Sequence, residues 1–115
     1  MSPSHAGFPS EDAANRVRER LILFVAGDAP RSRRARANLQ EALERHGLAG
    51  AWPREIDLLR HPEEGVAQGM LATPALLYRD PGRSHPATLY GDLSHTTTLD
   101  RFLAATGLAD NAATG

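Results

Sequence analysis

The chain has 115 residues, a length that fits one domain with a single compact core and is too short for two. Its formal net charge of -1, from 13 basic and 14 acidic residues, gives no general attraction to nucleic acid or to an anionic membrane. The chain contains no cysteine, which excludes a disulfide framework and thiolate catalysis, and it has no apolar segment long enough to span a bilayer.

The N-terminal residues lack the basic start and apolar stretch of a secretory signal, so we expect a cytoplasmic protein. Their weak apolar periodicity predicts a flexible tail over residues 1–18, although Ser10-Glu11-Asp12 has the composition of a short helix start. We expect the folded domain over residues 19–106 and a second flexible tail over residues 107–115.

The first strand is predicted by the continuous apolar run at residues 21–26, which is typical of a strand buried on both faces at the centre of a sheet. Residues 27–30 end this run, and Pro30 suits the first turn of a helix, where a missing N–H costs nothing. Apolar residues spaced by three and four then predict a helix as far as about His46. A second strand is expected within residues 51–59.

The second half of the chain predicts a short helix from His61 to about Gln68, strands at residues 75–78 and 87–90, and a helix at residues 98–105. Pro81-Gly82 is typical of a turn, so the two strands form a predicted hairpin. Thr73-Pro74 lies at the entry of the first of these strands, where proline is well suited and tolerates a cis bond better than other residues.

The predicted order is strand, helix, strand, short helix, hairpin and helix. This is the order of a thioredoxin-like α/β fold, with a central four-stranded mixed sheet and flanking helices. A right-handed crossover through the first long helix would make the first two strands parallel. In thioredoxin-like proteins the proline at the strand entry faces a Cys-x-x-Cys segment that does redox chemistry. Because this chain has no cysteine, we expect its function to lie in binding.

Three blocks between residues 21 and 103 resemble the KaiB family of bacterial clock proteins. The blocks are Leu23-Phe24-Val25-Ala26-Gly27-Asp28-Ala29-Pro30 with Ser32, Arg34 and Ala35; Ile56-Asp57 with Pro62; and Leu71-Ala72-Thr73-Pro74 with Gly91-Asp92-Leu93-Ser94. The resemblance implies a non-enzymatic adaptor without a cofactor, which docks on a hexameric RecA-type ATPase of the KaiC kind. It also implies fold switching between a tetrameric ground state and a monomeric thioredoxin-like state that binds the partner. A related domain serves as the sensor of a clock histidine kinase.

The chain departs from the family pattern at three places. Gln68-Gly69-Met70 stands where the family usually has a basic residue, and Arg36 stands where it tends to be apolar. Asp80-Pro81-Gly82-Arg83 offers an explicit turn, which favours the hairpin and hence the thioredoxin-like state. These departures indicate a divergent KaiB-like protein, which we expect to be a monomer or dimer rather than a tetramer.

Four arginines, Arg31, Arg33, Arg34 and Arg36, lie at the start of the predicted first long helix. One interpretation is a solvated helix face balanced by Glu41 and Glu44. The other is a docking surface for a phosphate or an acidic partner, with Arg34 in register with an arginine of the KaiB family. Nucleic-acid binding is disfavoured by the near-neutral charge and the small number of aromatic residues.

The Gly91-Asp92-Leu93-Ser94 segment precedes the last predicted helix. We expect Asp92 or Ser94 to cap that helix and Gly91 to adopt a conformation that other residues disfavour. In a fold-switching family, Gly91-Asp92 would also tune the balance between states. With Arg31, Arg33, Arg34, Thr73 and Pro74, these two residues form the predicted partner-binding or fold-switch set.

No catalytic, metal or cofactor site is predicted. The five histidines lack ligand spacing, neither a G-x-S-x-G nor a phosphate-binding glycine loop occurs, and Trp52 fits a core or sheet-face position better than a recognition aromatic. The leading hypothesis is a KaiB-like adaptor with a clock or stress-related role. The alternatives are a cysteine-free thioredoxin-like sensor or binding module of another system, such as a histidine-kinase partner, and a glutathione-type enzyme that presents the Thr73-Pro74 backbone to its ligand.

Overall fold

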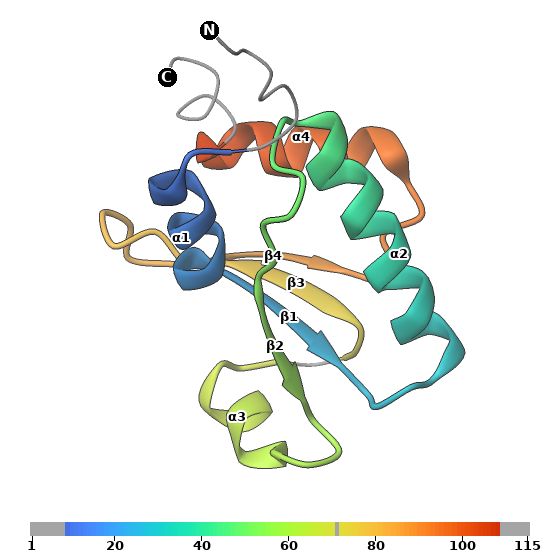
Figure 1. The fold of residues 1–115 in the computed structure, drawn as a ribbon. Coiled ribbons are helices and arrows are strands. Elements are labelled where there is room, and N and C mark those ends of the chain that lie inside the picture. The colour runs from blue at the N-terminus through green and yellow to red at the C-terminus, as the bar shows by residue number, and fades with distance from the viewer. Residues whose placement is uncertain (1–8, 71, 109–115) are drawn as a thin grey trace, which may run out of the picture.

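The computed structural model describes residues 9–70 and 72–108 (Figure 1). These residues form a four-stranded sheet with four helices. The elements in chain order are α1 (Glu11–Arg20), β1 (Leu21–Val25), α2 (Pro30–Arg45), β2 (Arg54–Asp57), α3 (Pro62–Ala67), β3 (Ala75–Tyr78), β4 (Ala87–Tyr90) and α4 (Thr96–Thr106). Leu71, the first residue of one block that resembles the KaiB family, lies outside the described residues.

The strand order in the sheet is β2-β1-β3-β4. β1 pairs with β2 in parallel and with β3 antiparallel, and β3 and β4 form an antiparallel hairpin. All five residues of β1 are buried, because this strand has neighbours on both sides and side-chain packing on both faces. The predicted central strand, parallel crossover, hairpin and mixed four-stranded sheet are therefore confirmed.

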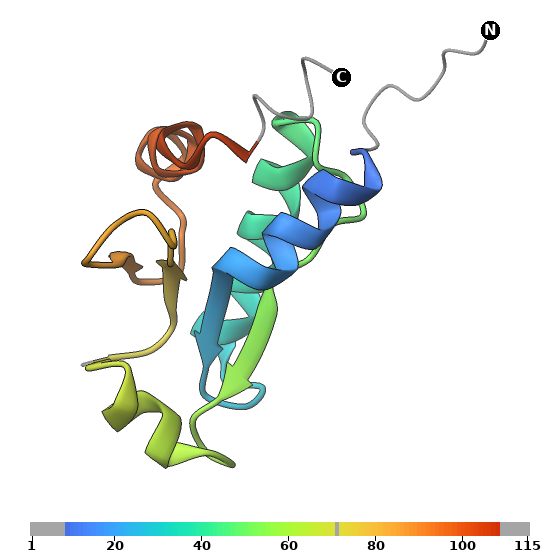
Figure 2. The ribbon, with the colours of Figure 1, turned by 90° about the vertical axis from the view of Figure 1, so that its left-hand side faces the viewer.

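Helices cover the two faces of the sheet unequally (Figures 1 and 2). On one face α1, α2 and α4 close the main core over Leu23, Leu76 and Tyr78. On the other face the short α3 region covers a smaller cluster that includes Phe24 and Ile56. Leu58 and Met70, which flank α3 in sequence, pack on this smaller cluster.

The N-terminal boundary differs from the prediction, because residues 11–18 belong to α1 and not to a tail. The Ser10 side chain accepts a hydrogen bond from the Ala13 N–H at 3.1 Å, which caps the helix as its composition suggests. Ala13 and Val17 lie one helical turn apart and are fully buried in the main core. Two small apolar residues in a polar segment are a weak sequence signal, and only the packing shows that α1 is part of the domain.

The C-terminal boundary also extends further than expected. α4 spans Thr96–Thr106 and ends at Gly107, which has a left-handed conformation with φ +76°. Leu108, assigned to the tail by composition, is 1% exposed and packs in the main core. The folded domain therefore includes residues on both sides of the predicted limits of 19 and 106.

The turn between β3 and β4 has the predicted form. The Arg83 N–H donates to the Asp80 carbonyl at 2.9 Å, and the Gly82 N–H donates to the Asp80 carboxylate at 2.9 Å. The side chain of Asp80 thus stabilises the turn that its backbone begins.

Candidate functional site

The start of α2 and the loop after β4 meet through Arg34 and Asp92. The Arg34 Nε donates to Asp92 Oδ2 at 3.1 Å, and the Asn38 side-chain amide donates to the Asp92 carbonyl at 2.9 Å. Arg34 and Asn38 are four residues apart and so share one face of the helix. Two side chains of α2 therefore hold both the carboxylate and the backbone of Asp92.

Thr73 and Pro74 join the same region through the backbone. The Thr73-Pro74 bond is cis, Pro74 is buried, and its carbonyl accepts a hydrogen bond from the Gly91 N–H at 2.9 Å. Gly91 has φ +110°, a conformation that favours glycine, as predicted. A Cβ atom added at Gly91 would lie 3.8 Å from Arg31 Nη2, so the Arg31 guanidinium lies beside this loop.

The predicted cap of α4 is wrong. The helix begins at Thr96, its N-cap residue is His95, and neither Asp92 nor Ser94 caps it with a side chain. Asp92 instead accepts the Ser94 N–H at 3.1 Å within the loop. Hydrogen bonding from the Ser94 side chain, followed by that from Arg34, lowers the pKa of Asp92. Asp92 is therefore a loop and ion-pair residue.

Leu93 carries local backbone strain in this loop. Its φ is +63°, which is uncommon for a residue with a branched side chain, and its side chain is 5% exposed in the main core. Burial of Leu93 and the contacts of Asp92 together hold the loop in this form.

A cavity of about 370 Å³ opens between the start of α2, the end of β4 and the start of α4. The apolar residues Leu89 and Leu93 line this cavity together with the polar residues Arg31, Ser94 and Thr98. Among the predicted site residues, Arg31, Gly91 and Asp92 line this cavity directly. Arg34, Thr73 and Pro74 lie next to it through the contacts with Asp92 and Gly91.

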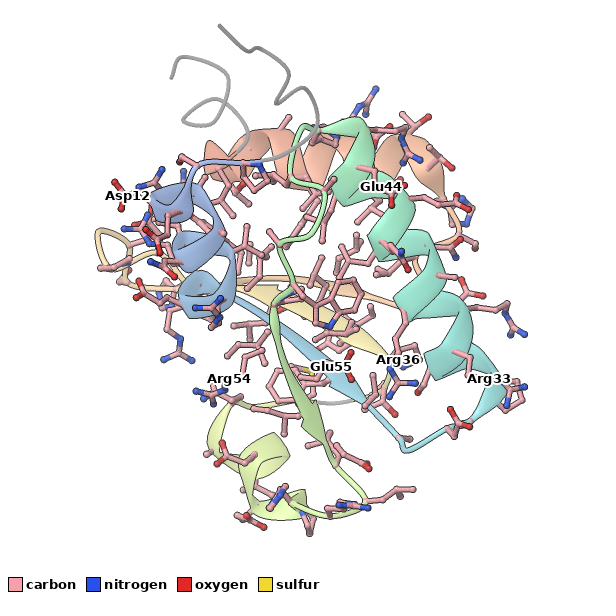
Figure 3. All side chains as sticks on the ribbon, in the orientation of Figure 1. Asp12, Arg33, Arg36, Glu44, Arg54 and Glu55 are labelled. Atoms are coloured by element: carbon pink, nitrogen blue, oxygen red, sulfur yellow. The ribbon has the colours of Figure 1, made fainter. Side chains whose placement is uncertain are left out.

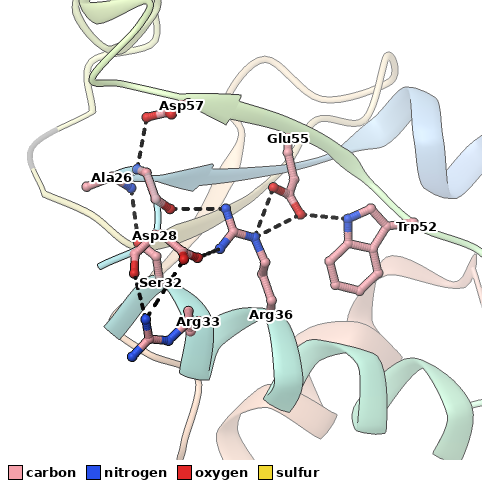
Figure 4. Close-up of polar contacts among 9 residues, drawn as sticks. Ala26, Asp28, Ser32, Arg33, Arg36, Trp52, Glu55 and Asp57 are labelled. Atoms are coloured by element: carbon pink, nitrogen blue, oxygen red, sulfur yellow. Dashed lines mark hydrogen bonds and ion pairs between the residues drawn. The ribbon is translucent and has the colours of Figure 1, made fainter. Parts of the chain in front are cut away.

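Arg33 and Arg36 face a different region, at the carboxyl ends of β1 and β2 (Figures 3 and 4). Arg36 Nε donates to Glu55 Oε1 at 3.1 Å, and its Nη2 donates to the Gly27 carbonyl at 3.2 Å. Arg33 Nη1 donates to the Asp28 carbonyl at 3.2 Å. Arg33, although predicted as part of the partner-binding set, therefore lies apart from the Arg34–Asp92 pair.

Asp57 makes the hydrogen bonds that join the ends of β1 and β2 in the region of Arg33 and Arg36, and it was not predicted as a site residue. Its Oδ1 accepts the N–H groups of Gly27 at 2.9 Å and Leu59 at 3.0 Å, which links the ends of β1 and β2. The hydrogen bond from Leu59, followed by that from Gly27 and the charge of Arg60, lowers the pKa of Asp57. The only sequence signal was its place in the Ile56-Asp57 block.

The side-chain contacts bear on two further predictions, the position of Trp52 and the carboxylates that balance the arginines of α2. Trp52 packs against the main core and its Nε1 donates to Glu55 at 2.8 Å, so the sheet-face interpretation is confirmed. Within residues 9–70 and 72–108, the carboxylates paired with Arg33, Arg34 and Arg36 are Asp28, Glu55 and Asp92, and none is Glu41 or Glu44.

The described residues contain no group of three or more histidine, aspartate or glutamate side chains placed to hold a metal ion. Within the same part of the chain, no helix has the length and apolar character needed to cross a membrane.

The fold is thioredoxin-like, and the sequence contains no cysteine. The chain is similar to mitochondrial thioredoxin 3 of Saccharomyces cerevisiae, with 13% identity and a TM-score of 0.59 over 82% of this chain and 87% of that one. It is also similar to thioredoxin of Fasciola hepatica, with 16% identity and a TM-score of 0.57 over 83% and 88% of the two chains. These likenesses establish the fold alone.

A further similarity is to the N-terminal domain of SasA from Synechococcus elongatus. The identity is 26% and the TM-score 0.50, over 72% of this chain and 76% of that one. No protein-family model matches the chain, and no curated protein matches it in sequence. The comparisons therefore establish a thioredoxin-like fold with a SasA-type domain among its structural neighbours.

Proposed function

We propose that this chain is a non-enzymatic, KaiB-like binding module that docks on a KaiC-type RecA-family ATPase. The observation that carries the proposal is the convergence of Arg31, Arg34, Pro74, Gly91 and Asp92 on one region. Arg34 belongs to the first block that resembles the KaiB family, and Pro74, Gly91 and Asp92 belong to the third. Arg31 lies beside them without being part of a block. The similarity to the SasA N-terminal domain supports the same class.

The chemistry of this region suits recognition of a protein surface. Arg31 and Arg34 are exposed, and a guanidinium offers several N–H donors in a planar arrangement that matches carboxylates. Arg34 and Asn38 of α2 hold the loop at Asp92, so the surface is organised before a partner binds. No thiol is present to support redox chemistry at the strand entry.

Binding in the thioredoxin-like state is part of the proposal. The turn at Asp80 and the contact between Asp92 and α2 both stabilise the arrangement of the second half of the chain. A change to a second fold would have to break them. The turn and this contact therefore bias the chain toward the state that we propose to be the binding form.

A second candidate partner is a histidine kinase, with the chain acting as a sensor or binding module. The KaiB resemblance favours it, because that resemblance includes a related domain that serves as the sensor of a clock histidine kinase. Both candidates use the same docking region, and the identity of the captured protein separates them.

The test is binding of the purified chain to a purified KaiC-type ATPase, measured by biolayer interferometry and by co-elution in size exclusion. Replacing Arg34 (Arg34→Gln) should weaken binding by about tenfold, the effect of losing one well-placed charged contact. Arg54→Gln is the matched control, because Arg54 is exposed on β2, at the opposite edge of the sheet from β4 and the loop that carries Asp92.

Capture from a native lysate with mass spectrometry extends the test to other partners. Recovery of an ATPase supports the leading proposal, and recovery of a histidine kinase supports the second. Absence of both, together with no binding to the purified ATPase, would overturn the proposed function. Thiol-transfer or conjugation activity of the purified chain would contradict its non-enzymatic character.

A further inference from the structure

β4 presents an open edge of the sheet. It is the last strand in the order β2-β1-β3-β4 and pairs only with β3. The Gly91 N–H donates to Pro74, which is opposite it in the register that pairs Tyr90 with Ala75. Because antiparallel pairs alternate, the backbone groups of Ala87 and Leu89 face β3, whereas those of Thr88 and Tyr90 face outward. No hydrogen bond from another described residue reaches these outward groups.

Charge and proline, two features that protect edge strands from pairing with another chain, are absent from the four residues of β4. The sequence Ala87-Thr88-Leu89-Tyr90 contains no charged residue and no proline, and Tyr90 is 45% exposed. The opposite edge strand, β2, carries Arg54, Glu55 and Asp57 within four residues. Charges on an edge strand disfavour the addition of another strand. Of the two edges, β4 is therefore the one suited to accept a further strand.

The cavity of about 370 Å³ lies at the end of this edge. Arg31, which lines it, makes no ion pair with any described residue, whereas Arg33, Arg34 and Arg36 each do. Thr98 also lines the cavity, and its carboxylate, Asp92, is already engaged by the Ser94 side chain and by Arg34. Arg31 therefore remains as the cationic donor for a carboxylate ligand.

We propose that β4 accepts an extended segment of a partner protein as a fifth strand, and that this segment places an Asp or Glu side chain against Arg31. Main-chain hydrogen bonds to Thr88 and Tyr90 supply affinity, and the charged pocket supplies specificity. The inference rests on the proposed function, because it states how a docking partner engages the same region.

A second copy of the chain fits this edge less well than an acidic partner. Two β4 strands that pair antiparallel about a two-fold axis would bring the segment before β4 of one copy toward the cavity of the other. That segment carries Arg83 and His85 and has no acidic residue after Asp80. The approach of Arg83 to Arg31 would be repulsive. The charges therefore favour a partner segment of different sequence that contains a carboxylate.

The test is a selection of random twelve-residue displayed peptides on the purified full-length chain. Enriched peptides should contain an alternating apolar pattern and an Asp or Glu. Their affinity should fall by about tenfold with Arg31→Gln, while Arg33→Gln, on the same helix but paired with Asp28, leaves it unchanged. Thr88→Pro should also weaken binding by about tenfold, because it removes an outward N–H, whereas Thr88→Val retains that group.

Hydrogen exchange of the wild-type chain provides a second measurement that needs no variant. A bound peptide should slow exchange of the Thr88 and Tyr90 amides relative to the free chain. The proposal is overturned if no peptide is enriched, if the enriched peptides lack a carboxylate, or if their binding is insensitive to Arg31→Gln and leaves both amides unprotected. Dimerisation of the chain through β4, abolished by Thr88→Pro, would also overturn it.

The peptide selection and the ATPase binding measurement test the two proposals separately. Peptide binding without ATPase binding would support strand addition at β4 and contradict the proposed partner. ATPase binding that is unchanged by both Thr88→Pro and Arg31→Gln would support the proposed partner and contradict strand addition at β4.

Discussion

The side-chain amide of Asn38 donates to the backbone carbonyl of Asp92 at 2.9 Å, across 54 residues of sequence. This bond ties α2 to the loop after β4. Asn38→Ala should lower the free energy of unfolding by about 1 kcal/mol, the typical net value of one hydrogen bond. Urea unfolding measures it, with Gln40→Ala as the control because Gln40 is exposed on the same helix. Equal stability of the two variants would contradict a structural role for the Asn38 contact.

The stability of the domain should fall in acid. The pKa values of Asp57, Asp92 and Asp100 are lowered, chiefly by hydrogen bonds from Leu59, Ser94 and Arg45 respectively. A lowered carboxyl pKa stabilises the folded state above the ordinary value of about 4, and that contribution is lost as the pH falls through the lower folded-state value. The free energy of unfolding should therefore decrease below about pH 4.

Urea unfolding between about pH 7 and about pH 3 measures this dependence. Asp57→Asn should flatten the profile, because the group that links Gly27 to Leu59 no longer titrates. Glu41→Gln, which changes an exposed side chain of α2, should preserve the slope. A wild-type profile that is flat through this range would be inconsistent with the lowered pKa values.

The sequence predicted the sheet well because its signals are local. The apolar run of β1 and the turn residues at Pro81-Gly82 each identify an element without knowledge of the rest of the fold. For the candidate site, the sequence predicted which residues take part but not which of them contact one another. Arg34 and Asp92 are 58 residues apart, and both were named, but their pairing depends on how α2 packs beside the end of β4.

Two errors have a similar origin. Asp92 has the side chain of a helix cap, yet Arg34 and the loop backbone use its oxygens, and α4 begins four residues later, at Thr96. α1 was assigned to a tail because its apolar face consists of only a few small residues, and Val17 is recognised as core only through its tertiary neighbours. Helix propensity is a property of the local sequence, whereas the burial of a helix depends on the distant residues that pack against it in the fold.

α1 should contribute measurably to stability. Val17→Ala removes buried apolar volume and should lower the free energy of unfolding by about 2 kcal/mol. Ser10→Ala removes the N-cap and should cost about 1 kcal/mol. Glu19→Ala, at an exposed position of the same helix, should change stability by less than about 0.5 kcal/mol. Thermal and urea unfolding of the three variants distinguish an integral helix from a dispensable one.

Gly91→Ala should destabilise the domain through the backbone and not through a clash. The φ of +110° is disfavoured for alanine, whereas the added Cβ would meet Arg31 only at an ordinary 3.8 Å. The expected cost is about 1–3 kcal/mol. Gly82→Ala is the matched control, because its Cβ would also have an ordinary contact, at 3.6 Å, without a positive φ. Similar losses in both variants would show that backbone conformation is not the cause.

The chain should sediment as a monomer or dimer. The turn at Asp80 is closed by two hydrogen bonds and begins the β3–β4 hairpin, so it favours the thioredoxin-like state over the tetrameric fold that the KaiB resemblance implies. Asp80→Ala removes the bond to the Gly82 N–H and should lower the free energy of unfolding by about 1 kcal/mol. If the chain also adopts the tetrameric fold that the KaiB resemblance implies, Asp80→Ala should increase the tetramer fraction measured by analytical ultracentrifugation. Ser84→Ala, at an exposed position beyond the turn, should alter neither property, and a wild-type tetramer would contradict the prediction.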